Sequence, residues 1–144
     1  MNDYQKMRNR QQREFNMLPL GFAFNRKQFN EMMRGWGLHP ERDVKEVTCI
    51  GNGGYIQKKD VELLRQTSAR HKEELAAAIE SDTTGDGFIF QMFYRELKNH
   101  EYGYTGDADD TLDALNYTME QVQSDQRLYR GFQQACKKIM EEET

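Results

Sequence analysis

The sequence predicts a helix-dominated α+β fold, in which a small antiparallel sheet of two or three strands lies in the N-terminal half of a single domain, residues 1–144. Apolar residues recur at steps of three and four along most of the chain after residue 60, the spacing of a buried helical stripe. Two short β-rich runs flank Gly51-Asn52-Gly53-Gly54, whose Asn-Gly pair favours a tight hairpin turn. A chain of this length buries about 68–70% of its unfolded surface, which is enough for a core.

The first part of the chain contains an amphipathic helix over residues 1–16 and then the small sheet with one helix over residues 20–57. The apolar stripe of the first helix comprises Tyr4, Met7, Gln11 and Phe15. We expect strands near residues 20–24, 47–50 and 55–57. Asn25 followed by Gln28 has the capping-box pattern that begins the intervening helix.

Residues 60–143 form the helical region. Asp60 caps a long helix to about Ser81, on which one stripe of residues is expected to be buried: Val61, Leu64, Ser68, His71, Leu75 and Ala78. Ile89, Phe93 and Leu97 share one face of a second helix, over residues 88–100. We expect these two helices to pack together.

The remaining residues predict three further helices. Acidic residues begin a short one at Asp109, near its positive end, and Thr118 with Gln121 caps another. The last helix follows Asp125, and its buried stripe comprises Leu128, Phe132, Ala135 and Ile139.

Composition limits the function classes. No window approaches the roughly 18 apolar residues of a membrane span, and the N-terminus lacks the apolar run of a signal peptide, so we expect a cytoplasmic protein. Cys49 and Cys136 lack metal-ligand spacing and are expected to be reduced thiols, with no cofactor. Residues 1–74 carry 14 Lys and Arg against 10 Asp and Glu, whereas residues 75–144 carry 6 against 14, which makes the C-terminal half acidic.

The segment Asp82-Thr83-Thr84-Gly85-Asp86-Gly87-Phe88-Ile89 resembles the first eight positions of an EF-hand calcium loop. The twelfth position, where that loop requires a bidentate carboxylate, is Phe93, and the third is the neutral Thr84. Aspartate capping and glycine turns between two helices explain the same residues. We therefore expect no metal here, and Asp82 and Asp86 are only weak candidate ligands.

Catalytic and nucleic-acid signatures are also incomplete. The histidines available as bases are His39, His71 and His100, and none lies in a recognisable catalytic motif. Residues 112–122 have the rhythm of a helix-turn-helix, but their second helix is acidic, which disfavours binding to phosphates. We expect a protein that is not an enzyme and does not bind nucleic acid or membrane directly. A degenerate calcium module, a small-ligand-binding protein and a DNA-binding regulator remain alternatives.

Two segments carry a resemblance to a known group. They are residues 85–102, Gly-Asp-Gly-Phe-Ile-Phe-Gln-Met-Phe-Tyr-Arg-Glu-Leu-Lys-Asn-His-Glu-Tyr, with the following Thr105-Gly106-Asp107 and Thr111-Leu112-Asp113-Ala114-Leu115, and the opening Tyr4-Gln5-Lys6-Met7-Arg8 with Phe22-Ala23-Phe24. They resemble small uncharacterised proteins of phages and mobile genetic elements of gut Firmicutes. The resemblance transfers no activity or site residue. It implies an accessory protein that binds and blocks a host protein.

The leading hypothesis is therefore a non-enzymatic protein-binding accessory protein, an inhibitor of a host defence or nucleic-acid enzyme that acts through an acidic surface. Such a surface would compete for a basic groove that normally holds phosphates. The expected contact residues are Asp107, Asp109, Asp110 and Asp113, together with an exposed Tyr102 and Tyr104. The partner and the oligomeric state are not encoded in any recognisable pattern.

Overall fold

The computed structural model describes residues 2–144, which form two compact units. The helical unit comprises the chain up to Arg10 and Glu73–Thr144, and the sheet unit comprises Gln11–Lys72. Helices α1 (Asp3–Asn16) and α3 (Val61–Ser81) each contribute residues to both units. The predicted helix-dominated α+β fold class is confirmed. The assignment of residues 1–144 to one domain stays a prediction.

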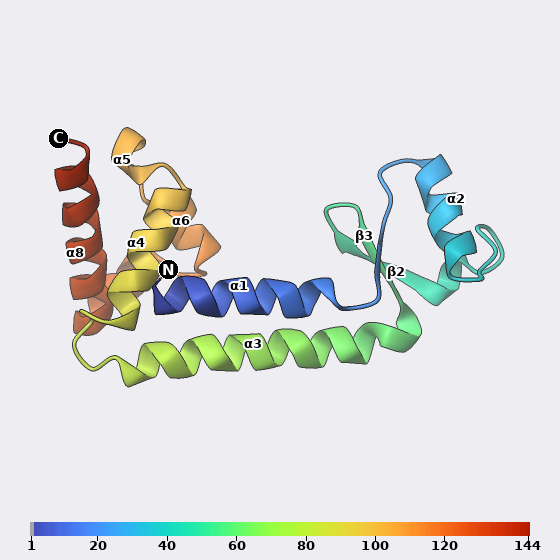
Figure 1. Ribbon diagram of the computed structural model, residues 1–144, viewed down its shortest axis with the longest axis horizontal. Coiled ribbons are helices and arrows are strands. Elements are labelled where there is room, and N and C mark those ends of the chain that lie inside the picture. Colours follow the sequence, from blue (N-terminus) through green and yellow to red (C-terminus); the bar gives the residue numbers. More distant parts are fainter. Residues whose placement is uncertain (1) are drawn as a thin grey trace. The chain divides into compact units, whose positions relative to one another are not determined.

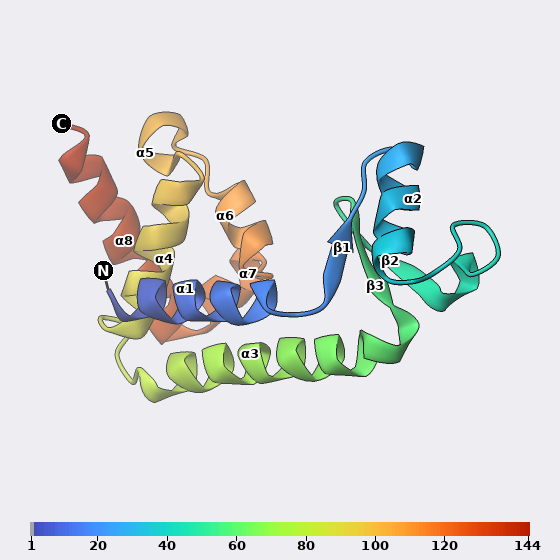
Figure 2. The same ribbon diagram turned by 45° about the vertical axis from the view of Figure 1, so that its right-hand side comes forward.

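The sheet unit contains a three-stranded antiparallel sheet in the order β1-β3-β2, formed by β1 (Leu20–Phe22), β2 (Val47–Gly51) and β3 (Gly54–Gln57) (Figure 2). Leu20 and Thr48 pair with Ile56 from opposite sides. The β2–β3 turn places Asn52 at φ 51° and Gly53 at φ 75°, the positive values that a two-residue type I′ hairpin needs. The three strand regions and the Asn-Gly turn are therefore as predicted.

Helix α2 (Arg26–Gly35) covers one face of this sheet. Its N-cap is Asn25, whose side chain accepts a hydrogen bond from the Gln28 backbone N–H at 2.8 Å. The Gln28 side chain accepts from the backbone N–H of Phe24, one residue earlier than a capping box requires. Two short 3₁₀ turns, Val44–Glu46 and Lys58–Asp60, precede β2 and α3, so Asp60 belongs to the turn that continues into the helix.

Helices α1 and α3 run side by side (Figure 1). In the sheet unit the Gln11 side chain donates to the backbone carbonyl of His71 at 3.2 Å, and in the helical unit Arg10 pairs with Glu74. The stripe predicted on α3 is not fully buried: Ser68 is exposed and Thr67 is the buried residue of this helix. Among the described residues, Leu75 and Ile79 are the α3 side chains that pack against the buried core of the helical unit, so the rest of the predicted stripe has no such core to cover it.

The helical unit is built on α4 (Phe88–Asn99) and α8 (Gln126–Glu142), which lie side by side. The shorter helices are α5 (Tyr102–Thr105), α6 (Asp109–Ala114) and α7 (Met119–Ser124). The buried core comprises Tyr4, Ile89, Met92, Phe93, Leu97, Leu112, Val122, Leu128, Phe132, Ala135 and Ile139. The predicted packing of α3 on α4 is limited to the edge of this core. Leu75 and Ile79 of α3 reach the edge of this core, but the principal partner of α4 is α8, which lies far away in sequence.

Among residues 2–144, no helix combines the length and apolarity that crossing a bilayer requires.

Gly131 lies where α8 packs on α4. A Cβ there would stand 2.6 Å from Ile89 Cγ2 and 2.8 Å from the carbonyl oxygen of Gly85. Because these atoms belong to the core and the backbone, we expect Gly131→Ala to lower the free energy of unfolding by about 1–3 kcal/mol, measured by urea denaturation. Gly35→Ala is the control, since its Cβ would have no atom within 4 Å. The control should leave stability unchanged or raise it by up to about 1 kcal/mol, and equal losses in both variants would contradict this packing.

Candidate functional site

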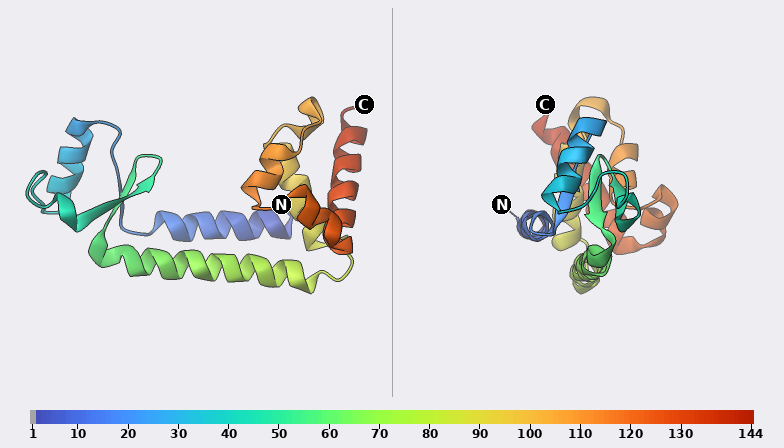
Figure 3. Two further views of the ribbon diagram at one scale, coloured as in Figure 1. Left: turned by 180° about the vertical axis from the view of Figure 1, so that it is seen from behind. Right: turned by 90° about the vertical axis from the view of Figure 1, so that its right-hand side faces the viewer.

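The four aspartates predicted to contact a partner are all exposed. They lie between α5 and the end of α6, and we call Tyr104, Asp107, Asp109, Asp110 and Asp113 the acidic surface (Figure 3, orange). Tyr104 is 91% exposed. The aspartates project outward because the two residues between Asp110 and Asp113, Thr111 and Leu112, are buried against the helical unit.

Hydrogen bonds hold this segment in place. The Thr111 hydroxyl donates to the backbone carbonyl of Glu96 on α4 at 3.3 Å, and Asp107 Oδ1 accepts from the backbone N–H of Asp109 at 2.9 Å. Within residues 2–144, none of the four aspartates forms an ion pair with a lysine, arginine or histidine. The acidic surface therefore presents negative charge that the described part of the chain does not neutralise.

Tyr102 does not belong to this surface. It is half-buried against the core of the helical unit, whereas the sequence predicted an exposed side chain. A hydrogen bond with the Cys136 side chain, together with burial, raises the pKa of the Tyr102 hydroxyl to about 12. Tyr102 thus fastens α5 to α8, and Tyr104, two residues on, is the aromatic residue that faces solvent.

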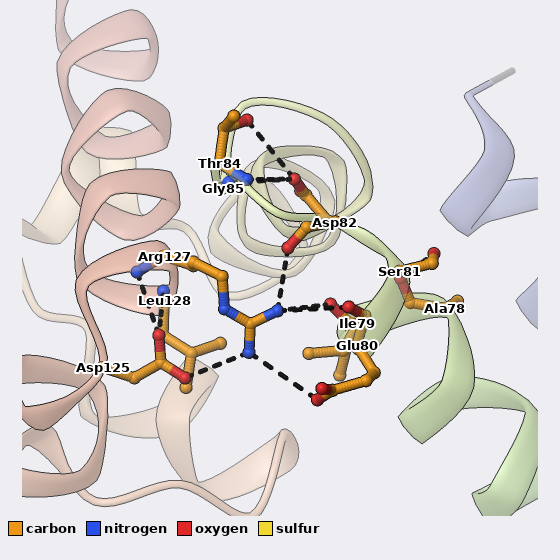
Figure 4. Close-up of polar contacts among 10 residues, drawn as sticks. All are labelled: Ala78, Ile79, Glu80, Ser81, Asp82, Thr84, Gly85, Asp125, Arg127 and Leu128. Carbon is orange, nitrogen blue, oxygen red and sulfur yellow. Dashed lines mark hydrogen bonds and ion pairs between the residues drawn. The ribbon is translucent and has the colours of Figure 1, made fainter.

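The loop that resembles an EF-hand is a junction between helices (Figure 4). The Asp82 carboxylate accepts backbone N–H groups from Thr84, Gly85, Gly87 and Ile89 at 2.9–3.2 Å. Desolvation acts to raise the pKa of Asp82, but these hydrogen bonds outweigh it and the pKa is lowered. The N-cap position of α4 is Gly87, and Asp82 accepts N–H groups at this helix start from further upstream; aspartate capping with a glycine turn is confirmed in this form.

Arg127, in the first turn of α8, satisfies the other side of this junction. Its Nη1 donates to the backbone carbonyls of Ile79 at 3.2 Å and Asp82 at 2.8 Å, which end α3. Its Nη2 pairs with Asp125, the N-cap of α8, at 3.2 Å. Arg127 therefore joins the end of α3 to the start of α8.

The two weak metal candidates are engaged by these contacts. Asp82 accepts N–H donors on both carboxylate oxygens, and Asp86 Oδ1 pairs with Arg130 Nε at 2.7 Å. A cation would have to displace those donors. Among residues 2–144, no three His, Cys, Asp or Glu side chains gather in a metal-binding group.

The histidines also have partners. In the sheet unit, His71 Nε2 lies 2.8 Å from Glu14 Oε2, and Arg70 pairs with the same oxygen at 3.1 Å. In the helical unit, His100 Nδ1 donates to the backbone carbonyl of Glu96 at 2.7 Å and lies 4.0 Å from its carboxylate. The spacing of four residues between Glu96 and His100 is a helical signal that sequence analysis missed.

Glu96 also receives a hydrogen bond from a buried tyrosine. The Tyr4 hydroxyl donates to Glu96 Oε1 at 3.0 Å, and Tyr4 is only 1% exposed. Burial and the neighbouring carboxylate raise the pKa of Tyr4 well above its usual value. These contacts hold the start of α1 against α4. The Glu96 carboxylate therefore has a structural role.

The sheet unit carries a cleft that sequence analysis missed. We call it the aromatic cleft; its volume is about 500 Å³, and it is lined by Ala23, Phe24, Asn25, Arg26, Phe29, Val44 and Tyr55. Phe24 is 74% exposed and Val44 is 50% exposed, so two large apolar side chains meet solvent in the same cleft. The Phe22-Ala23-Phe24 run was interpreted only as a strand, although β1 ends at Phe22 and Phe24 lies beyond it.

Charge divides between the two units. The sheet unit carries 11 Lys and Arg against 7 Asp and Glu, a net charge of +4, and the helical unit carries 9 against 17, a net charge of -8. The acidic surface and the aromatic cleft therefore lie in units of opposite net charge.

The fold and these surfaces define a helix-dominated α+β protein that carries an exposed acidic surface and an apolar cleft on separate units. The chain belongs to DUF7659, a family of unknown function, whose family model matches residues 3–138. Neither the curated proteins nor the solved structures give a significant match.

The Asp82 junction makes stability depend on pH. Because the native pKa of Asp82 lies below its ordinary value of 3.8, its charged form stabilises the fold above that pH, and the effect is lost as pH falls through the lower native pKa. We expect Asp82→Asn to cost about 1–2 kcal/mol at pH 7 and progressively less below pH 3.8, measured by urea denaturation across pH.

Asp86→Asn is the matched control, because its pair with Arg130 is exposed and screened by solvent and therefore contributes little to stability. A cost of Asp82→Asn that stays constant down to pH 2, or an equal cost in both variants, would contradict the assigned role of Asp82.

Proposed function

We propose that this protein is a non-enzymatic protein-binding accessory protein of a phage or another mobile genetic element. It acts in the cytoplasm and binds a host protein through the acidic surface. The target is an enzyme of host defence or of nucleic-acid metabolism, whose basic groove normally holds phosphates. The acidic surface inhibits this enzyme by occupying that groove.

The observation that carries the proposal is the exposure of four unpaired carboxylates within seven residues. Asp107, Asp109, Asp110 and Asp113 lack cationic partners within the described residues, and Tyr104 adds an aromatic ring. A basic groove attracts uncompensated carboxylates as it attracts phosphates. Complementary electrostatic potential accelerates association and fixes how the two surfaces align. Tyrosine supplies contact area at low entropic cost.

The polar groups of the interior support a binding role over a catalytic one. His71 and His100 contact Glu14 and Glu96 at a helix seam and at a helix end, where these contacts hold elements together. A catalytic base needs a reacting group within hydrogen-bond reach and a cleft to hold it. The aromatic cleft is lined by neither histidine.

The test compares the wild-type protein with a variant that carries Asp107→Asn, Asp109→Asn, Asp110→Asn and Asp113→Asn. Asparagine retains an oxygen that can cap the Asp109 N–H, so the fold should survive. Each protein is used as bait in a bacterial lysate, and captured proteins are quantified by mass spectrometry. We expect the wild type to capture a nucleic-acid-binding protein. The variant should capture at least about tenfold less of that protein.

The matched control replaces four other exposed carboxylates of the helical unit by glutamine, with the same change in charge: Glu73, Glu101, Glu120 and Glu141. It should retain capture. Added duplex DNA should compete with the acidic surface for the basic groove of the captured protein. Unchanged capture by the asparagine variant, with the same salt dependence as the wild type, would refute charge mimicry.

Calcium binding is the alternative raised by the Asp82–Gly87 pattern. It would show as a thermal shift on adding calcium that disappears in Asp82→Ala and in Asp86→Ala. The Asp82 carboxylate already accepts four backbone N–H donors, which a calcium ion would have to displace. These contacts disfavour the calcium alternative relative to the protein-binding proposal.

A further inference from the structure

We propose that the aromatic cleft is a second binding site, which takes an acidic peptide segment bearing one aromatic or large aliphatic side chain. The site lies in the sheet unit and shares no residue with the acidic surface. The acidic surface is proposed to bind a basic partner, whereas the aromatic cleft would bind an acidic one. The two binding roles can therefore succeed or fail independently.

Phe24 forms an exposed wall of the cleft because backbone contacts hold it there. Its ring lies against the β2–β3 turn, where a Cβ on Gly53 would come within 2.3 Å of the ring. The Ala23 N–H donates to the Gly53 carbonyl at 2.9 Å, and the Phe24 N–H donates to Gln28 Oε1 at 2.8 Å. The Phe24 side chain is 74% exposed, and covering it would remove apolar surface from water.

Phe29, Tyr55 and Val44 add further apolar surface to the lining. Phe29 of α2 packs edge-on against Tyr55 of β3, with ring centroids 5.4 Å apart. Val44, in the 3₁₀ turn before β2, is 50% exposed. A cleft of about 500 Å³ lies within the range of small-ligand pockets, and it is large enough to accept one bulky side chain with part of its backbone.

The charge at the cleft is positive. The Arg26 guanidinium lies 5.6 Å from the centroid of the Phe29 ring, and no carboxylate of residues 2–144 pairs with it. Lys27 and Lys45, which adjoin lining residues in sequence, also lack ion pairs within that range. Two carboxylates also lie next to these residues in sequence: Asp43 precedes Val44, and Glu46 follows Lys45. Asp43 accepts the His39 N–H at 2.8 Å and lies 3.7 Å from Arg42, and Glu46 is exposed.

This combination favours an acidic peptide over other ligands. An unpaired guanidinium beside an aromatic wall binds carboxylates in a bidentate geometry while the cleft takes an apolar side chain. Single-stranded nucleic acid needs a row of cations along its backbone as well as stacking rings. Among residues 2–144, Arg26 is the one cation that lines the cleft. A purely apolar ligand would leave that guanidinium facing an uncharged surface.

The test is a selection of random 12-residue peptides displayed on phage, using the full-length protein as target. We expect the enriched peptides to combine an aromatic or large aliphatic residue with at least two Asp or Glu residues. The affinity of one enriched peptide is then measured by fluorescence anisotropy. Arg26→Glu should weaken it by at least about tenfold and Phe24→Ser by a similar factor.

Arg34→Glu is the matched control, because Arg34 is exposed on the same helix and lies outside the cleft lining. It should change affinity by less than about threefold. The four-asparagine variant of the acidic surface should bind the peptide as the wild type does, which separates failure of this site from failure of the proposed function.

Four results would overturn the proposal. They are the absence of enrichment, enriched peptides without acidic residues, full binding by Arg26→Glu, and a stronger effect of Arg34→Glu than of Arg26→Glu. Binding of a 15-nucleotide oligo-dT that depends on Phe24 and Arg26 would assign the cleft to single strands instead. Self-association in sedimentation velocity that Phe24→Ser abolishes would assign it to a second copy of the chain.

Discussion

The helical unit depends on one polar junction, formed by the Asp82 carboxylate and the Arg127 guanidinium. Where a helix stops and another starts, backbone carbonyls and N–H groups are both left without partners. Arg127 binds the carbonyls at the end of α3, and Asp82 binds the N–H groups at the start of α4. Because Arg127 lies in the first turn of α8 and is held by Asp125, the same contacts fix three helices at one point.

This junction also explains why a pattern that resembles a calcium loop occurs without its last ligand. Both loops must turn sharply and satisfy several N–H groups with one aspartate, so they share aspartate and glycine at similar positions. Here the positive charge is supplied by Arg127 and Arg130, and Gly85 is required because its Cβ would stand 2.2 Å from the Arg127 carbonyl oxygen. The similarity is therefore one of turn geometry.

Much of the fold could be predicted because it is decided within a few residues of sequence. The Asn52-Gly53 turn, the Thr118 capping box and the buried stripe from Leu128 to Ile139 all follow from local rules, and the structure shows each of them. Local rules do not identify which helix another helix packs against. That is why the pairing of α4 with α8, across more than twenty residues of short helices and turns, was not predicted.

The site was predictable only in part, for the same reason. The acidic residues are consecutive enough in sequence to be noticed, and they are exposed as expected. Tyr102 forms its hydrogen bond with Cys136, which lies far away in sequence, and the aromatic cleft combines residues near positions 23–29, 44 and 55, which no local pattern connects. The one local signal for the cleft is the pair Phe22 and Phe24, which indicates that aromatic rings lie near the end of β1.

We propose that this protein works through surfaces of opposite charge carried by separate units. Titrating the ¹⁵N-labelled protein with a hexa-arginine peptide and following its amide signals by NMR tests this claim most directly. We expect the largest shifts at residues 104–113 and none at the aromatic cleft. Shifts centred on the acidic C-terminal residues 141–143, or spread evenly over both units, would contradict it.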